Sequence, residues 1–139
     1  MSRFHEFYFG ERSKADRFQI TESVRNSKFY NKSGTETTSD AKAILLWEAK
    51  YQNSWLVRTN ERIYKVQDDI RKDRPIINWS RNIELFKSTY IINALEYKPN
   101  TGKIIFEQKP NKEYRYSKKL FFNKNIESVI SSFIKTGDF

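Results

Sequence analysis

The sequence contains no cysteine and a single histidine, His5. The lack of cysteine excludes disulfide bonds, thiolate zinc sites and a cysteine nucleophile. A two-histidine metal site or a serine–histidine pair would have to rest on His5, and a lone histidine is a poor catalyst without a positioned partner. We therefore expect no metal ion, no cofactor and no catalytic residue.

Long hydrophobic runs and glycine-rich loops are also missing. No run is long enough for a transmembrane helix, and residues 1–6 lack the apolar stretch of a signal peptide, so the expected location is the cytoplasm. The four glycines are scattered and form no phosphate-binding loop. With so few glycines and only three prolines, the chain is expected to fold.

The sequence is rich in aromatic residues and in positive charge. Aromatic residues make up 16% of the 139 residues, and they can fill a small core although hydrophobic residues total only 37%. Together with the β-branched residues they favour strands. The length suits one domain, and the net charge of +9 suits an anionic partner.

The beginning of the chain differs from the rest. It holds an aromatic cluster, a helical pattern somewhere within residues 13–25, and a polar Gly/Ser/Thr-rich stretch over residues 31–40 that predicts a loop. We expect an N-terminal extension over residues 1–40, partly helical or loop, and one domain over residues 41–139.

Within residues 41–139, short apolar or alternating runs predict about seven antiparallel strands. The expected strands cover residues 43–47, 55–57, 62–66, 76–79, 89–97, 103–107 and 114–116. Residues 51–54 are predicted as a turn and residues 68–75 as a charged, solvated loop, whereas residues 82–86 fit either a strand end or a helical turn. In the run 62–66, alternation places Ile63 and Lys65 on one face and Tyr64 and Val66 on the other.

The last element is predicted as an amphipathic helix within residues 123–137. Its apolar residues recur at helical spacing, Asn123 or Asn125 can cap its start, and Gly137 suits its end. An open sheet would leave long edges, so we expect a small barrel with this helix plugging one end.

The order of strands and closing helix resembles the pleckstrin-homology (PH)-like superfold. The stretch Trp55–Val66, with Thr59–Asn60 at its turn, is similar to a hairpin of bacterial PH and GRAM-like domains. The resemblance covers residues 41–136. It implies a mainly β (α+β) PH-like barrel, filled in part by Trp55, Val57, Ile63 and Val66. It also implies a non-catalytic module that binds protein or peptide and sometimes lipid, although the basic spacing that binds phosphoinositides in eukaryotic PH domains is absent.

The positive charge is concentrated in residues 103–124, where seven Lys and Arg residues face two Glu, a net charge of +5. Such a surface attracts nucleic acid, anionic lipid or an acidic protein, and aromatic residues among cations are typical of single-strand binding. In the alternative, Phe121 and Phe122 seat the last helix and the lysines are merely solvated. The candidate binding residues are Lys109, Lys112, Tyr114, Arg115, Tyr116, Lys118 and Lys119, with Arg71, Lys72 and Arg74 from the charged loop.

Two acidic patterns point to metal chemistry only weakly. Glu48-Ala-Lys50 resembles half of a metal-dependent nuclease site, but its partner Asp40 would lie roughly 26 Å away at the other end of one strand. The pair Asp68–Asp69 with Asp73 is interleaved with cations, which favours local ion pairs over a bound cation. We therefore expect an adaptor that docks on a protein partner, with nucleic-acid binding as the alternative and an anionic membrane surface as a weaker one.

Overall fold

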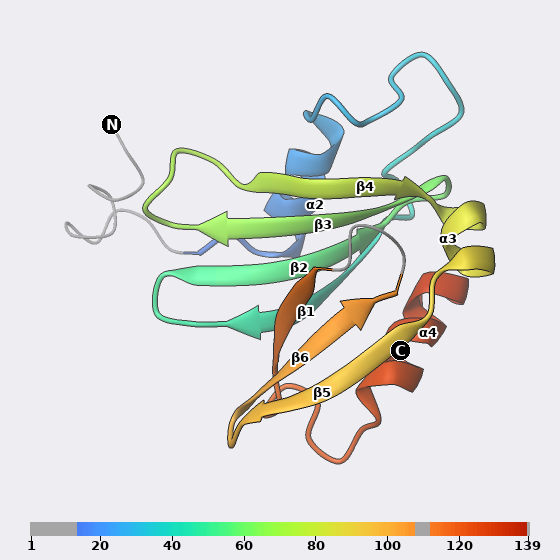
Figure 1. Cartoon of the computed structure of the whole chain (residues 1–139). Helices are drawn as coiled ribbons and strands as arrows, with labels where there is room; N and C mark the ends of the chain where they lie inside the picture. Colours follow the sequence, from blue (N-terminus) through green and yellow to red (C-terminus); the bar gives the residue numbers. More distant parts are fainter. Residues whose placement is uncertain (1–13, 108–111, 139) are drawn as a thin grey trace.

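The computed structural model describes residues 14–107 and 112–138 (Figure 1). Over these residues, seven strands form two antiparallel sheets, accompanied by three helices. The four-stranded sheet contains β1 (Lys42–Glu48), β2 (Gln52–Arg58), β3 (Arg62–Asp69) and β4 (Ile76–Asn82). The three-stranded sheet contains β5 (Ile92–Lys98), β6 (Thr101–Phe106) and β7 (Glu113–Ser117), and the helices are α2 (Arg17–Arg25), α3 (Ile83–Thr89) and α4 (Ile126–Thr136). The expected mainly β chain with a C-terminal helix is confirmed.

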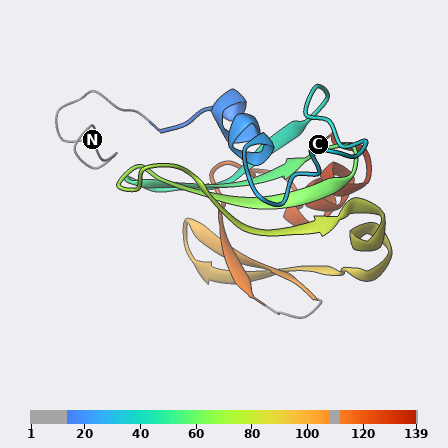
Figure 2. The same cartoon turned by 90° about the horizontal axis from the view of Figure 1, so that it is seen from above.

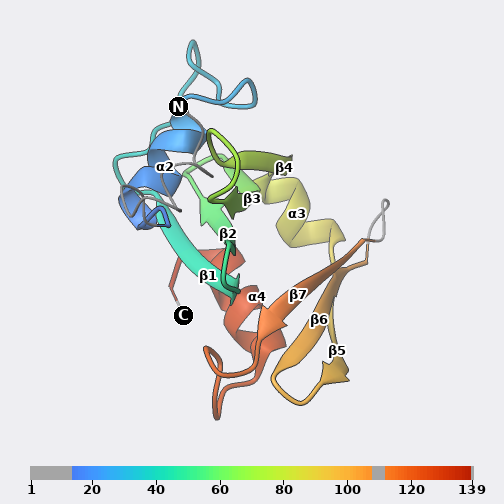
Figure 3. The ribbon, with the colours of Figure 1, turned by 90° about the vertical axis from the view of Figure 1, so that its left-hand side faces the viewer.

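The expectation of a closed barrel is wrong. Among the described residues, β4 and β5 belong to different sheets, because the chain between them forms α3 (Figure 3). Asn82 ends β4 and caps this helix, its side chain accepting from the backbone N–H groups of Glu84 and Leu85. Of the ambiguous residues 82–86, Asn82 is therefore the strand end and residues 83–86 are helical, and the strand expected from residue 89 begins only at Ile92.

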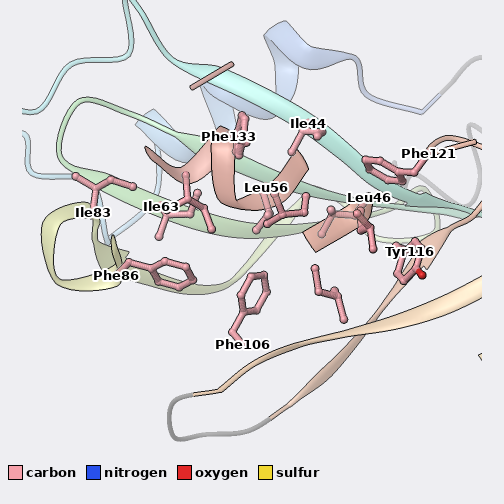
Figure 4. Packing of buried hydrophobic residues seen from close by; sticks show 14 residues of the cluster. Ile44, Leu46, Leu56, Ile63, Ile83, Phe86, Phe106, Tyr116, Phe121 and Phe133 are labelled. Atoms are coloured by element: carbon pink, nitrogen blue, oxygen red, sulfur yellow. The ribbon is translucent and has the colours of Figure 1, made fainter. Parts of the chain in front are cut away.

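The larger core lies between the two sheets and is closed by α3 and α4 (Figure 4). Leu56 and Ile63 enter it from the four-stranded sheet, and Phe106 enters it from the three-stranded sheet. The predicted C-terminal helix is confirmed, with its apolar stripe in this core, Asn125 as its N-cap and Gly137 in the left-handed conformation at φ 83°.

A second core lies on the opposite face of the four-stranded sheet, under α2 (Figure 2). Ile20 and Val24 of the helix pack there with Trp55, Val57, Tyr64 and Val66 of the sheet. Of the four residues expected to fill the barrel, only Ile63 lies between the sheets. The reason is the period of two along a strand, which turns Trp55 and Val57 away from their neighbour Leu56.

Two boundaries in the four-stranded sheet differ from the predictions. Residues 52–54 are not a turn but the start of β2, and β3 continues to Asp69. Polar side chains stabilise this extension across the strands, because Ser54 Oγ donates to Gln67 Oε1 at 2.7 Å and Gln52 Nε2 donates to Asp69 Oδ2 at 3.1 Å.

The helix α2 falls within the predicted range 13–25. Asp16 and Gln19 form a capping box at its start. Just before it, the backbone N–H of Ala15 donates to Asp68 Oδ2 at 2.9 Å, and Asp68 is fully buried. Asp68 is therefore not part of a solvated loop; its carboxylate attaches the start of α2 to the end of β3.

The segment that follows α2 is held by a buried carboxylate. Glu36 is 4% exposed and accepts from Thr59 Oγ1 at 2.6 Å, Tyr64 Oη at 2.7 Å and the backbone N–H of Asn31 at 3.0 Å. Burial raises the pKa of Tyr64, and the hydrogen bond to Glu36 adds to this effect. The predicted loop is thus irregular but firmly tied to the turn between β2 and β3.

We expect Glu36→Ala to lower the free energy of unfolding by roughly 2–4 kcal/mol, because it removes the carboxylate that accepts from Tyr64 Oη and the Asn31 N–H and leaves Thr59 Oγ1 with only its 3.3 Å contact to Arg62 O. Urea unfolding followed by circular dichroism measures the change. Glu22→Ala is the control, since Glu22 makes only a 3.9 Å ion pair with Arg25 on the surface of α2, and it should change stability by less than about 0.5 kcal/mol. Equal effects of the two substitutions would contradict this role of Glu36.

Candidate functional site

The outer face of the three-stranded sheet carries exposed aromatic and cationic side chains next to each other. Strand register places Lys103 opposite both Leu95 and Arg115, and their side chains point away from the core that contains Ile104 and Tyr116. The corresponding face of the four-stranded sheet lies under α2, whereas no described helix covers this face (Figure 2). The fold therefore presents these side chains to solvent.

Cations on this face lie against Tyr97 and against Trp47, which belongs to β1 and is partly buried against the larger core. The guanidinium carbon of Arg115 is 5.6 Å from the ring centroid of Trp47 and 5.4 Å from that of Tyr97. The Nζ atoms of Lys103 and Lys98 lie 4.3 Å and 5.1 Å from the Tyr97 ring. Such contacts hold a guanidinium in place while leaving N–H donors on its edge for an anionic partner.

Ion pairs neutralise only part of this charge. Lys103 Nζ is 2.7 Å from Glu113 Oε2, and Lys118 pairs with Glu96. Within the described ranges, no ion pair is formed by Lys112, Arg115 or Lys119. The surface thus keeps cations available to phosphate or carboxylate groups; we name the Trp47, Tyr97, Lys103 and Arg115 side chains the sheet platform.

The residues predicted for this site fall into three groups in the structure: the cations in or beside β7, the two tyrosines of β7, and the cations of the loop between β3 and β4. The first group consists of Lys112, Arg115, Lys118 and Lys119. Lys109 lies outside the described residues. Tyr114 and Tyr116 point the other way, into the core between the sheets, because side chains alternate along β7. Burial raises the pKa of both tyrosines.

The third group, Arg71, Lys72 and Arg74, lies in the loop between β3 and β4, away from the β7 cations in both Figure 1 and Figure 3. Arg71 is engaged by Asp69, with Nε 2.9 Å from Oδ1 and Nη2 2.9 Å from Oδ2. This pairing lowers the pKa of Asp69 to about 2. The ion pair expected in this loop is therefore present, but its cations do not join the sheet platform.

A buried lysine occupies the space between the two sheets. Lys65 is 1% exposed, and its Nζ lies 3.4 Å from Asn78 Oδ1 and 5.0 Å from the ring centroid of Tyr114. Burial lowers the pKa of Lys65 to about 7. The alternation of residues 62–66 predicts that Lys65 shares a face with Ile63, and in the structure both side chains are buried.

Beside Lys65 lies a small aromatic cleft that already contains a cation. Phe86 and Tyr90 stack with centroids 4.1 Å apart, and Arg81 lies 5.6 Å from the Trp79 centroid while its Nε donates to Tyr90 Oη at 3.1 Å. The free space is about 20 Å³, which leaves no room for a ligand.

Trp47 and Tyr97 are platform residues that no pattern in the sequence indicated. Tyr97 is the last residue of the strand expected over residues 89–97, and the structure shows that its side chain is exposed. Trp47 stands in an apolar run of β1 and meets Arg115 only because β1 and β7 come together, where the Glu48 N–H donates to Ser117 Oγ at 3.1 Å.

In the part of the chain that the structure describes, no three acidic or histidine side chains gather as they would around a metal ion. No helix over the same residues has the length and hydropathy needed to cross a bilayer. Comparison with protein-family models, curated protein sequences and solved structures finds no match to this chain. The similarity to PH-like domains therefore stays a prediction.

We expect the stability of the protein to rise between pH 7 and pH 9.5, by on the order of 3 kcal/mol. The pKa of Lys65 is about 7 when folded and 10.5 ordinarily, so in this range the unfolded chain binds a proton that the folded chain does not. Above about pH 10, the raised pKa values of Tyr64, Tyr114 and Tyr116 reverse the trend, because the unfolded tyrosines lose their protons first.

Lys65→Met should abolish that rise and stabilise the protein at pH 7, as measured by urea unfolding at several pH values. Lys119→Met, at an exposed position, is the matched control and should leave the rise intact. A rise that persists in Lys65→Met would show that other groups cause it.

Proposed function

We propose that this protein binds single-stranded nucleic acid on the outer face of the β5–β6–β7 sheet. The observation that carries the proposal is the position of Arg115 against the rings of Trp47 and Tyr97, on a sheet face that no described helix covers. Guanidinium groups bind phosphate through paired N–H donors, and aromatic rings stack on bases. The platform offers both kinds of group side by side.

The charge distribution supports the same ligand. Lys98, Lys112 and Lys119 surround the platform, and all three are exposed. The net charge of +9 attracts a polyanion over distances beyond direct contact. Nucleic acid also accounts for the aromatic component, which an acidic protein surface would not require.

A single strand fits the platform better than a duplex does. Tyr97 is 39% exposed and Leu95 is 44% exposed, so the face provides rings and apolar surface as well as charge. In a duplex the flat faces of the bases are hidden in the stack, whereas an unpaired strand can turn them toward the sheet. The ligand is therefore a strand bound without strict sequence preference.

The finer fold assignment belongs to this proposal too. Two sheets of four and three antiparallel strands followed by a helix are compatible with a PH-like topology. Because one fold serves many functions, the surface rather than the fold decides between ligands. We propose the cytoplasm as the location, where such strands occur.

Docking on a protein partner is the second candidate, and the edge of β5 favours it. The backbone N–H of Glu107, the residue after β6, donates to Ile91 O at 2.7 Å. Because backbone groups of successive residues alternate in direction along an antiparallel strand, those of Ile92 and Ala94 point away from β6. Ile91 and Ile92 line a groove of about 700 Å³ between β5 and α4, and Ile91 is 63% exposed. An extended peptide could add to this edge as a further strand.

The nucleic-acid proposal is tested with a fluorescein-labelled twelve-residue oligothymidylate, followed by fluorescence anisotropy at several salt concentrations. We expect log affinity to fall with log salt by about 0.7 per phosphate contacted. Arg115→Ala should weaken binding roughly tenfold or more and make the slope shallower by about 0.7, since it removes one phosphate contact.

Arg74→Ala is the matched control, because it removes the same charge from an exposed loop of the other sheet. It should change the affinity by less than about twofold. A salt-independent affinity, or equal losses in the two variants, would argue against the platform. Absence of oligonucleotide binding by the unmodified protein would leave the peptide groove as the better candidate.

A further inference from the structure

A cleft of about 700 Å³ opens beside the sheet platform, where the end of β1, the β5–β6 turn and the segment after β7 meet. Trp47, Thr101, Lys118, Lys119 and Phe122 are among the residues that line it. Its volume lies in the range of small-molecule sites, so one nucleotide unit fits without filling it.

The cleft continues the platform without a break. Thr101 pairs with Ser117 two register positions from the pair Lys103–Arg115, so alternation places both pairs on the same face of the sheet. Trp47 belongs to both surfaces, because it lines the cleft and also lies 5.6 Å from the Arg115 guanidinium. A strand lying across the platform therefore reaches the cleft with its next residues.

Phe122 is the residue that gives the cleft its chemistry. Its neighbour Phe121 is 7% exposed and packs in the core beside α4, but Phe122 is 75% exposed. The alternative that both rings seat the last helix therefore holds for Phe121 alone. Single exposed rings are common on protein surfaces, but Phe122 lines a cleft together with Trp47 and Lys119, where its flat apolar face is available to a ligand.

The walls of the cleft are held in place by backbone hydrogen bonds. Lys118 N donates to Asn100 O at 3.2 Å, which joins the segment after β7 to the β5–β6 turn. Within that segment, Phe121 N donates to Lys118 O at 3.2 Å and Lys124 N donates to Phe121 O at 3.0 Å. The ring of Phe122 thus projects from an ordered turn, which reduces the entropy lost when a ligand stacks on it.

The lining of the cleft carries two lysines, Lys118 and Lys119, and one carboxylate, Glu48. Lys118 is paired with Glu96, whereas Lys119 is exposed and, among the described residues, forms no ion pair, so Lys119 is the cation available to a phosphate. A base stacked on an aromatic ring and a phosphate near a lysine ammonium are the two parts of one nucleotide.

We propose that this cleft holds one nucleobase of the bound strand, stacked on Phe122 beside Trp47, with the adjoining phosphate at Lys119. This inference rests on the proposed function and adds to it an anchoring position for a single base. It separates two contributions to affinity: salt-dependent phosphate contacts on the platform and a salt-independent stacking contact in the cleft.

The test compares Phe122→Ala with Phe18→Ala on two probes, oligothymidylate of twelve residues and an abasic oligomer with the same number of phosphates. Phe18 is the matched control, because it is 72% exposed on α2. Phe122→Ala should weaken binding of oligothymidylate roughly 5- to 100-fold without changing the salt slope, and it should leave binding of the abasic oligomer unchanged. Phe18→Ala should leave the affinity for both probes unchanged.

The outcomes distinguish this inference from the proposal beneath it. If oligothymidylate binds, responds to Arg115→Ala and ignores Phe122→Ala, the cleft assignment is overturned while the platform stands. Equal losses on the abasic oligomer would also overturn it, since stacking requires a base. If the unmodified protein binds neither probe, the platform itself fails and the cleft assignment falls with it. Both rings are exposed, so thermal unfolding should show unchanged stability in the two variants.

Discussion

The hairpin of β2 and β3 is buried on both of its faces, with Leu56 and Ile63 in the core between the sheets and Val57 and Tyr64 beneath α2. Polar groups in such a hairpin have no access to water and need partners within the protein. The Glu36 carboxylate accepts hydrogen bonds from Tyr64 and Thr59 of this hairpin. Asp68, at the end of β3, accepts one from the backbone N–H of Ala15. Residues 14–40 thus supply hydrogen-bond partners to the sheet that they cover.

The other sheet is buried on one face only, and this asymmetry places the candidate site. The inner residues of β6 and β7 enter the core, so their alternate neighbours must face solvent. On the four-stranded sheet the same alternate positions lie under α2 and are apolar. On the three-stranded sheet they include Lys103 and Arg115, so the cations gather on the sheet face that no described helix covers.

Local patterns in the sequence predicted the elements well, but they could not say which face of a strand would be covered. Alternation correctly separated Ile63 from Tyr64, yet the interior of the fold depends on where α2 packs. The prediction of a closed barrel is wrong because the chain forms a helix after Asn82, which caps that helix, and the strand does not continue. The same alternation separates Arg115 from Tyr114 and Tyr116, so the sequence held the signal that these tyrosines face away from the cations. The contact between Trp47 and Arg115 joins distant parts of the chain and required the tertiary structure.

The two candidate surfaces of the three-stranded sheet differ in what a ligand must displace. At the edge of β5, the Ala94 N–H already donates to Glu127 Oε1 at 2.9 Å, so an added strand must break that hydrogen bond and leave the carboxylate to find another partner. On the platform, Arg115 is exposed and, among the described residues, forms no ion pair that a phosphate would have to break. A carboxylate on an edge N–H also protects a strand from unwanted pairing. An anion can therefore bind to the face of this sheet without breaking that hydrogen bond, whereas a strand that pairs with its edge must first break it.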